Sequence, residues 1–180
     1  MRIVVSGTHA VGKSTLVSDF AMSHPQFEVL PDPFDLVDVL EPASTASFRE
    51  QLTVAAERLM VLAPGADVIV ERGPLDFIAY LAATEALGRA SVFAQTWTGL
   101  RATTAAAMAR VDLLVVLPLT NADGIWVPDE EDPELRVAMD EHLLDLCDDE
   151  ELVGDVGCLL EVAGPPEDRV ARLTQWLGPR

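Results

Sequence analysis

Residues 7–14 read Gly-Thr-His-Ala-Val-Gly-Lys-Ser and match the pattern G-x-x-x-x-G-K-[ST], whose residue types suit the binding of phosphate groups. The glycines allow successive backbone N–H groups to turn inward around an anion, and the N-terminus of a following helix adds a partial positive charge. In such a loop Lys13 reaches the outer phosphates and the hydroxyl of Ser14 binds Mg²⁺. The motif therefore predicts a site for a nucleoside triphosphate and Mg²⁺, with ATP as the expected nucleotide and GTP as the alternative. The predicted nucleotide contacts are Gly7, His9, Ala10, Val11, Gly12, Lys13, Ser14 and Thr15.

The segments on both sides of this loop are the ones that the motif requires. Residues 2–6 form a β-branched, apolar run that predicts a strand, and residues 13–22 have the apolar spacing of a helix. The alternative is an ordinary strand, turn and helix with a capping serine. Because that alternative leaves Gly7, Gly12 and Lys13 unexplained, we favour phosphate binding.

An acidic and a basic residue follow another apolar run. Glu71 and Arg72 come directly after residues 68–70, which predicts that they lie at the carboxyl end of a strand. In an open α/β sheet, ligands bind at that edge. Glu71 could bind Mg²⁺ there, directly or through water. Arg72 could neutralise the charge on the phosphoryl group during its transfer, or it could bind an acceptor. The alternative is an ion pair at a strand end.

Asp32 stands between two prolines after the short run 28–30. A residue before proline is restricted to an extended conformation, which would hold this carboxylate in place at the sheet edge. It could accept the proton of an attacking hydroxyl. Aspartate, with an ordinary pKa of about 3.9, is a weak base, so it would mainly orient that hydroxyl. A plain turn aspartate is the alternative.

Five apolar runs alternate with helical patterns along the chain. The runs cover residues 3–6, 28–30, 68–70, 113–117 and 159–162. Helices are predicted over residues 13–23, 47–62, 75–87 and 92–110, from residue 132 onward, and after residue 166. This alternation predicts an α/β fold with a five-stranded parallel sheet covered by helices on both faces. Asp76, in the first turn of the third helix, is interpreted as a partner of the helix dipole rather than a catalyst.

Length and composition limit the classes of function. A chain of 180 residues with 49% hydrophobic content suits one domain over residues 1–180. A formal net charge of −18 argues against a nucleic-acid groove or an anionic membrane surface, so the expected partner is a small-molecule substrate. No run approaches about 18 apolar residues, and the cysteines and histidines are scattered. We therefore expect a cytoplasmic protein without a zinc site or a disulfide framework.

Four features together resemble the deoxynucleoside kinase family of P-loop kinases: the phosphate loop, the Pro-Asp-Pro after the second strand, Phe48 three residues before Gln51, and the Glu-Arg pair. Nicotinamide riboside kinases and other small P-loop kinases share this outline. The resemblance implies that Asp32 is the general base and that Gln51 pairs with the nucleobase. Glu71 would bind the metal ion, and Arg72 would bind the sugar hydroxyl. It also implies ATP-dependent transfer of the γ-phosphoryl group to a hydroxyl of a nucleoside-like acceptor.

By the same resemblance, we expect the three-layer P-loop NTPase fold with strand order 2-3-1-4-5 and a lid region over residues 119–148. Family members close an arginine-rich lid over the phosphates, whereas residues 119–135 here contain no basic residue. Arg136 is the first cation after them. It is either the lid arginine or a partner of Asp132 or Asp140.

Gly164 and Pro165 resemble the turn on which P-loop kinases place the adenine ring, with a plain helix start as the alternative. The acceptor is left open among a nucleoside, a sugar, an antibiotic and a nucleoside monophosphate, for which Arg49 and Arg58 are the candidate ligands. A non-catalytic nucleotide-binding regulatory module is the alternative of another class. Both a monomer and a homodimer remain open.

Overall fold

The computed structural model describes residues 1–36, 44–120 and 132–178. Within them, five parallel strands form one sheet in the order β2-β3-β1-β4-β5. The strands are β1 (Arg2–Ser6), β2 (Glu28–Leu30), β3 (Val68–Glu71), β4 (Leu113–Val116) and β5 (Leu159–Glu161). The helices are α1 (Lys13–Ser23), α2 (Thr45–Val61), α3 (Pro74–Ala86), α4 (Ala94–Met108), α5 (Pro133–Cys147), α6 (Glu150–Val153) and α7 (Pro166–Leu177), with a 3-10 turn over Pro33–Asp35. The predicted fold class and strand order are confirmed.

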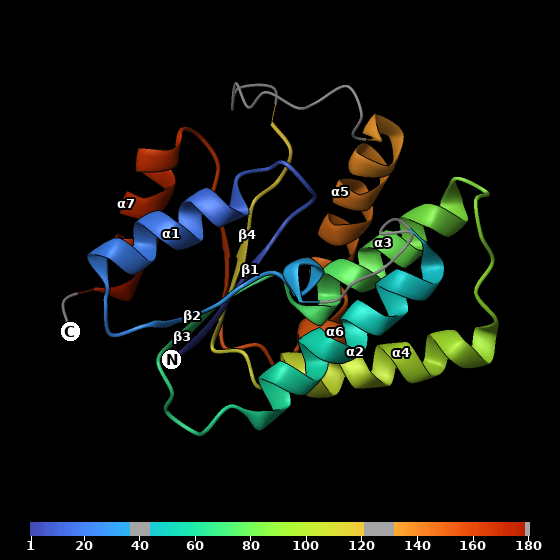
Figure 1. The fold of residues 1–180 in the computed structure, drawn as a ribbon, viewed down its shortest axis with the longest axis horizontal. Helices are drawn as coiled ribbons and strands as arrows, with labels where there is room; N and C mark the ends of the chain where they lie inside the picture. The colour runs from blue at the N-terminus through green and yellow to red at the C-terminus, as the bar shows by residue number, and fades with distance from the viewer. Residues whose placement is uncertain (37–43, 121–131, 179–180) are drawn as a thin grey trace.

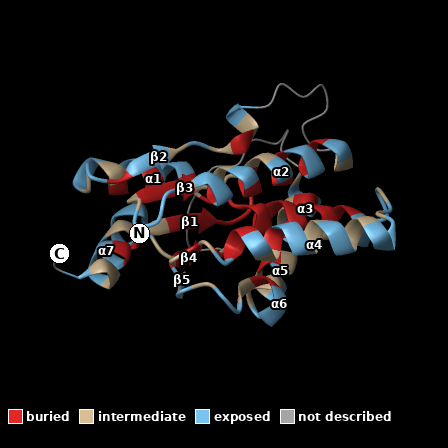
Figure 2. Ribbon diagram, turned by 90° about the horizontal axis from the view of Figure 1, so that it is seen from below, coloured by how far each residue is buried: buried red, intermediate tan, exposed pale blue. Residues whose placement is uncertain are grey.

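Helices cover both faces of the sheet, so the molecule has three layers (Figure 1). α1 and α7 lie on one face, and α2 to α6 lie on the other. Strand residues alternate between these faces: Ile3 and Val5 of β1 join the core under α1 and α7, whereas Val4 joins the core under the other helices. All three side chains are fully buried, and Figure 2 shows that the buried residues continue from the strands into α3. The alternation follows from the two-residue period of a strand.

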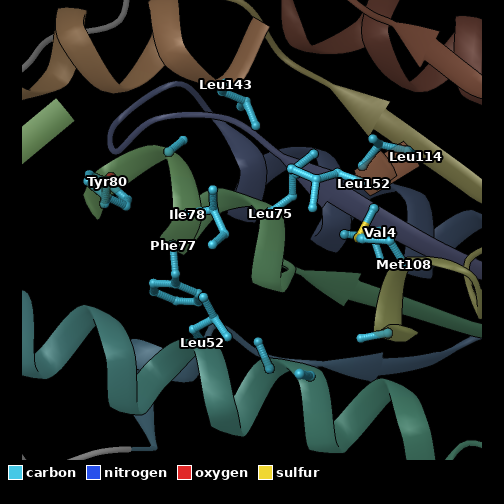
Figure 3. Close-up of a cluster of buried hydrophobic side chains, with 14 of the residues drawn as sticks. Val4, Leu52, Leu75, Phe77, Ile78, Tyr80, Met108, Leu114, Leu143 and Leu152 are labelled. Atoms are coloured by element: carbon cyan, nitrogen blue, oxygen red, sulfur yellow. The ribbon is translucent and has the colours of Figure 1, made fainter. Parts of the chain in front are cut away.

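α3 lies at the centre of the larger core (Figure 3). It packs against α2, α4 and α5, and it is apolar on nearly every side. Its Leu75, Phe77, Ile78 and Leu81 are at most 1% exposed. Burial of one such side chain stabilises a fold by about 1.5–3 kcal/mol. Because α3 is fixed in this way, its first turns supply rigid positions beside the ends of β1 and β3.

The smaller core anchors the helix that follows the phosphate loop. Leu16, Val17 and Phe20 of α1 pack with Leu173 of α7 over the sheet, and all four are at most 3% exposed. Because these side chains hold α1, its N-terminus keeps a fixed place at the carboxyl end of β1.

The predicted helices are present, and α4 continues through Gly99 without a break. The short helix α6 was not predicted. Within the predicted lid region, residues 121–131 lie outside the described part of the chain, while α5 packs Leu135 and Met139 into the larger core. None of the described helices combines the length and the apolar character that crossing a membrane requires.

Candidate active site

The phosphate loop lies between β1 and α1, at the carboxyl end of the central strand. Gly7 runs so close to the segment after β4 that a Cβ on it would lie 2.8 Å from both the carbonyl oxygen of Leu117 and Cγ1 of Val11. Ala10 and Gly12 have φ angles of 49° and 97°, in the left-handed region. The loop therefore turns tightly before α1 begins, and Gly7 stands where no side chain would be accommodated.

Asp76 of α3 fixes the start of this loop. Its Oδ1 accepts the N–H of Gly7 at 2.9 Å, and its Oδ2 accepts the hydroxyl of Ser6 at 2.6 Å and the N–H of Gly73 at 3.0 Å. The side chain is completely buried. Asp76 does lie in the first turn of α3, as the sequence indicated, but it is also an anchor of the phosphate loop. An acid three residues after a glycine that begins a helix signals the bond to Gly73, but it does not signal the contact with the loop.

Lys13 begins α1 and is the only lysine in the chain. Its side chain is 4% exposed, and Nζ donates a hydrogen bond to the carbonyl oxygen of Thr8 at 2.7 Å. Burial, together with the charge of Arg72, lowers its pKa to about 7, against the opposite effect of Asp76 and other carboxylates. A phosphate placed in the loop would favour the charged ammonium form.

Ser14 and Glu71 come together across the loop and the end of β3. The Oγ of Ser14 donates to Oε1 of Glu71 at 2.6 Å. A hydroxyl and a carboxylate oxygen side by side are the hard oxygen ligands that Mg²⁺ prefers, so the two residues fit the predicted metal site. Thr15, next along α1, is exposed.

Asp32 and Arg72 form an ion pair at the carboxyl ends of β2 and β3. Nε of Arg72 donates to Oδ2 of Asp32 at 2.8 Å, and the side chains are 4% and 13% exposed. Asp32 is extended, as Pro33 requires, and its Oδ1 accepts the N–H of Phe34 at 3.1 Å. Arg72 has a φ of 64°, which is uncommon for any residue except glycine. Such a conformation turns the chain sharply after β3 and marks a functional candidate.

Aromatic rings surround the guanidinium of Arg72. Its central carbon lies 5.1, 5.4 and 5.9 Å from the ring centroids of Phe34, Tyr80 and Phe77. Cation–π attraction operates over this range. The rings hold the charged group in one place, close to the carboxylate of Asp32.

Tyr80 of α3 joins this cluster to the phosphate loop, and the sequence analysis did not identify it. Its hydroxyl oxygen accepts the backbone N–H of His9 at 3.1 Å and a hydrogen bond from Nη1 of Arg72 at 3.3 Å. Nδ1 of the His9 ring lies 3.1 Å from the same oxygen, and the two rings stack. Burial and the charge of Arg72 lower the pKa of His9 to about 4, so its ring is neutral at physiological pH.

Arg136 lies over the phosphate loop. Nε and Nη2 donate to the carbonyl oxygens of His9 and Ala10 at 3.0 and 3.2 Å, and the backbone carbonyl of Arg136 accepts the hydroxyl of Thr8. Both of its proposed acidic partners have other contacts: Asp132 pairs with Arg89, and the carboxylate of Asp140 accepts the N–H of Leu119. Arg136 is thereby placed beside the predicted phosphate site.

Gly164 and Pro165 form the turn between β5 and α7, and Gly164 has a φ of 97°. Arg169, in the first turn of α7, connects this turn to the phosphate loop. It donates from Nε to the carbonyl oxygen of Gly164 at 2.7 Å and from Nη1 to that of Val11 at 2.6 Å. Sequence reasoning did not find Arg169, because no motif marks it.

The candidate residues of α2 do not all lie at one site. Gln51 is completely buried. Its Nε2 donates to Oγ of Ser47 at 2.8 Å, while Oε1 has no hydrogen-bond partner among the described residues. Arg58 donates to the carbonyl oxygen of Pro31 at 2.7 Å, next to Asp32. Arg49 instead lines a separate surface hollow between α2 and α4.

The fold is similar to solved structures of other proteins. No protein-family model and no curated sequence matches the chain. A deoxyadenosine kinase from M. mycoides with bound dATP is similar with a TM-score of 0.72 and 13% sequence identity, covering 99% of this chain and 100% of that one. The thymidylate kinase from Candida albicans has a TM-score of 0.63 and 15% identity over 98% and 90% of the two chains. The resemblance to P-loop nucleoside kinases is confirmed at the level of the fold.

Proposed function

We propose that this protein is a kinase that transfers the γ-phosphoryl group of ATP to a hydroxyl of a nucleoside-like small molecule. The proposal depends mainly on one observation. The ion pair of Asp32 and Arg72 lies at the strand ends that face the phosphate loop, and Tyr80 connects the pair to that loop. A proton acceptor, Asp32, and a cation, Arg72, are therefore held together next to a site suited to a triphosphate.

On the nucleotide side, the chain would bind ATP mainly through backbone groups. The N–H groups of residues 10–14 would surround the phosphates, since those of Gly7 and His9 are bonded to Asp76 and Tyr80. The N-terminus of α1 would add its positive end. Lys13 and Arg136 would neutralise the charge on the outer phosphates, since both already contact carbonyl groups of the loop. The turn at Gly164 and Pro165 would hold the adenine ring.

Ser14 and Glu71 would hold Mg²⁺. The ion would screen the negative charge of the phosphates. The carboxylate of Glu71 also accepts the proton of the Ser14 hydroxyl in a hydrogen bond, which leaves lone pairs of the Ser14 oxygen available for the ion.

On the acceptor side, Asp32 would orient the attacking hydroxyl by accepting its hydrogen bond. The hydroxyl oxygen then bonds to the γ-phosphorus as the bond to ADP breaks, and its proton passes late to the Asp32 carboxylate. Arg72 would stabilise the negative charge on the phosphoryl oxygens. Oε1 of Gln51 has no hydrogen-bond partner within residues 1–36, 44–120 and 132–178. It would accept a hydrogen bond from the nucleobase, because a buried polar atom without a partner is costly.

A nucleoside monophosphate is the second candidate acceptor. Arg58 lies next to Asp32 through its bond to Pro31, so two guanidinium groups flank the proposed acceptor position. Arginines bind phosphate well through paired N–H groups. A thymidylate kinase among the structural neighbours agrees with this candidate, as a deoxyadenosine kinase agrees with the first.

The test measures ADP formation from Mg·ATP with a panel of nucleosides, nucleoside monophosphates, sugars and aminoglycosides. We expect one of the first two classes to accelerate ADP release and to yield a phosphorylated product by mass spectrometry. Lys13→Ala should abolish that rate while the circular dichroism spectrum stays unchanged. A regulatory module would show only slow hydrolysis that no acceptor accelerates, and this result would refute the kinase proposal.

A further inference from the structure

Arg169 occupies an unusual place for a charged side chain. It lies in the first turn of α7 with 2% of its surface exposed. Its guanidinium donates to two backbone carbonyl oxygens, that of Val11 at 2.6 Å and that of Gly164 at 2.7 Å. One side chain therefore joins two segments that are far apart in the sequence.

The two carbonyl groups belong to the two halves of the proposed nucleotide site. Val11 is the residue directly before Gly12 and Lys13, where the loop turns into α1. Gly164 is the left-handed residue of the turn before α7. A guanidinium is a planar, rigid group with N–H donors in fixed directions. Its two bonds consequently fix the position of the turn relative to the loop, which an isolated contact to either segment would not do.

Packing alone does not account for an arginine at this position. Leu173, one turn further along α7, is completely buried and packs against α1 without a charged group. Burying a guanidinium costs free energy that a leucine would not require. The geometry of its two hydrogen bonds is thus the property that distinguishes Arg169 from the apolar residues around it.

We propose that Arg169 is a positioning residue that couples base binding to phosphate binding; the inference rests on the proposed binding of ATP. When adenine occupies the turn at Gly164, the turn loses motion, and through Arg169 so does the carbonyl of Val11. The neighbouring loop N–H groups are then ordered for the phosphates. Binding of the two parts of ATP is cooperative for this reason, and the coupling acts equally in both directions.

The experiment compares Mg·ATP with Mg·tripolyphosphate, which carries the phosphates without the base. Calorimetry gives Kd for both ligands in the wild type, in Arg169→Gln and in Arg172→Gln. Arg172 is exposed on the same helix and serves as the matched control. We expect Arg169→Gln to weaken ATP binding by about tenfold or more. The ratio of the tripolyphosphate Kd to the ATP Kd should also fall, whereas Arg172→Gln should resemble the wild type.

Gly164→Ala provides a second variant that keeps Arg169 in place. An alanine at a φ of 97° is strained, so the turn should shift while the loop keeps its sequence. The same decrease in the Kd ratio is expected, which covers the case in which Arg169→Gln fails to fold.

Three results would overturn the inference. One is an unchanged Kd ratio in a folded Arg169→Gln protein, even with a lower Tm, because that pattern describes a purely structural residue. Another is an unchanged ratio in Gly164→Ala. The third is the absence of any ATP binding by the wild type, which would refute the proposed function itself and is recognised separately because it appears before any substitution.

Discussion

Arg72 and Asp32 are 40 positions apart in the chain, yet Nε of Arg72 lies 2.8 Å from Oδ2 of Asp32. Parallel pairing of β2 with β3 brings their carboxyl ends together and makes this contact. Both side chains are largely buried, so removing one charge leaves the other in a poorly hydrated place. The pair therefore bears on both stability and the proposed chemistry.

Asp32→Asn should reduce kcat and stability together. The amide keeps the shape and an acceptor oxygen, but it cannot take a proton from the acceptor hydroxyl. We expect kcat to fall by about 10²–10⁴-fold. The free energy of unfolding should decrease by about 3 kcal/mol, the lower end of the cost of breaking a buried ion pair. Steady-state kinetics and urea unfolding measure the two effects.

Asp35→Asn is the matched control for this substitution. Asp35 lies in the same 3-10 turn, but its side chain is exposed. Its replacement should leave kcat within about twofold and change stability by no more than about 0.5 kcal/mol. If Asp32→Asn retained the wild-type kcat, Asp32 would be a structural partner of Arg72 and nothing more.

The phosphate loop and the sheet were predictable because their signals are local. Gly7, Gly12 and Lys13 lie within one short segment, and the apolar period of each strand depends only on its own residues. The strand-end positions of Asp32 and Arg72 were predicted in the same way, and the carboxyl ends of parallel strands are where ligands bind in such sheets.

Tyr80, Asp76 and Arg169 show what local patterns leave out. Each contacts the phosphate loop through a single polar group on a helix distant in the sequence. Tyr80 lies among apolar neighbours on α3 and resembles an ordinary core residue by its spacing. Their roles depend on how α3 and α7 pack against the loop, which is a property of the tertiary structure.

Lys13 should titrate near neutral pH in the free protein. Because the chain has no other lysine, isotope labelling of lysine gives a single side-chain signal by NMR. We expect a pKa of about 7 without nucleotide, and an increase when Mg·ATP binds, since the phosphates favour the ammonium form. Binding at pH 8 should therefore take up roughly one proton, measured by calorimetry in buffers of different ionisation enthalpy.

The same shift has a defined effect on stability. The folded-state pKa lies below the ordinary value of 10.5, so between about pH 7 and 10.5 the folded protein binds fewer protons than the unfolded chain. The contribution of Lys13 to the free energy of unfolding therefore rises with pH in this window. A pKa of Lys13 near 10.5 in the free protein would contradict the effect of burial on this side chain. Lys13→Arg, which stays charged, should bind nucleotide without proton uptake.

Glu71→Gln should raise the Mg²⁺ concentration that half-saturates activity by about tenfold or more. The amide is a weaker ligand for a hard cation than the carboxylate, although it still accepts the hydrogen bond of Ser14. A Mg²⁺ titration at saturating ATP measures the effect. Glu28→Gln, on the exposed edge strand β2, is the control and should leave the titration unchanged. An unaltered Mg²⁺ requirement in Glu71→Gln would exclude Glu71 as a metal ligand.

Tyr80→Phe should weaken ATP binding while the core stays packed. The ring keeps its stacking on Phe48, with centroids 4.8 Å apart, but the N–H of His9 and one donor of Arg72 lose their acceptor. Unpaired buried donors cost about 1–3 kcal/mol. We expect a loss of that size in the free energy of unfolding and a several-fold increase in the Kd for ATP.

Thr84→Val separates these two effects. Thr84 is one turn further along α3, and its buried hydroxyl donates to the carbonyl oxygen of Tyr80 at 2.7 Å without contacting the loop. This substitution should lower stability by about 1 kcal/mol and leave the Kd for ATP unchanged. Equal effects of the two variants on ATP binding would mean that α3 influences the site only through overall stability. A selective effect of Tyr80→Phe would instead support the hydroxyl of Tyr80 as the connection between the phosphate loop and Arg72.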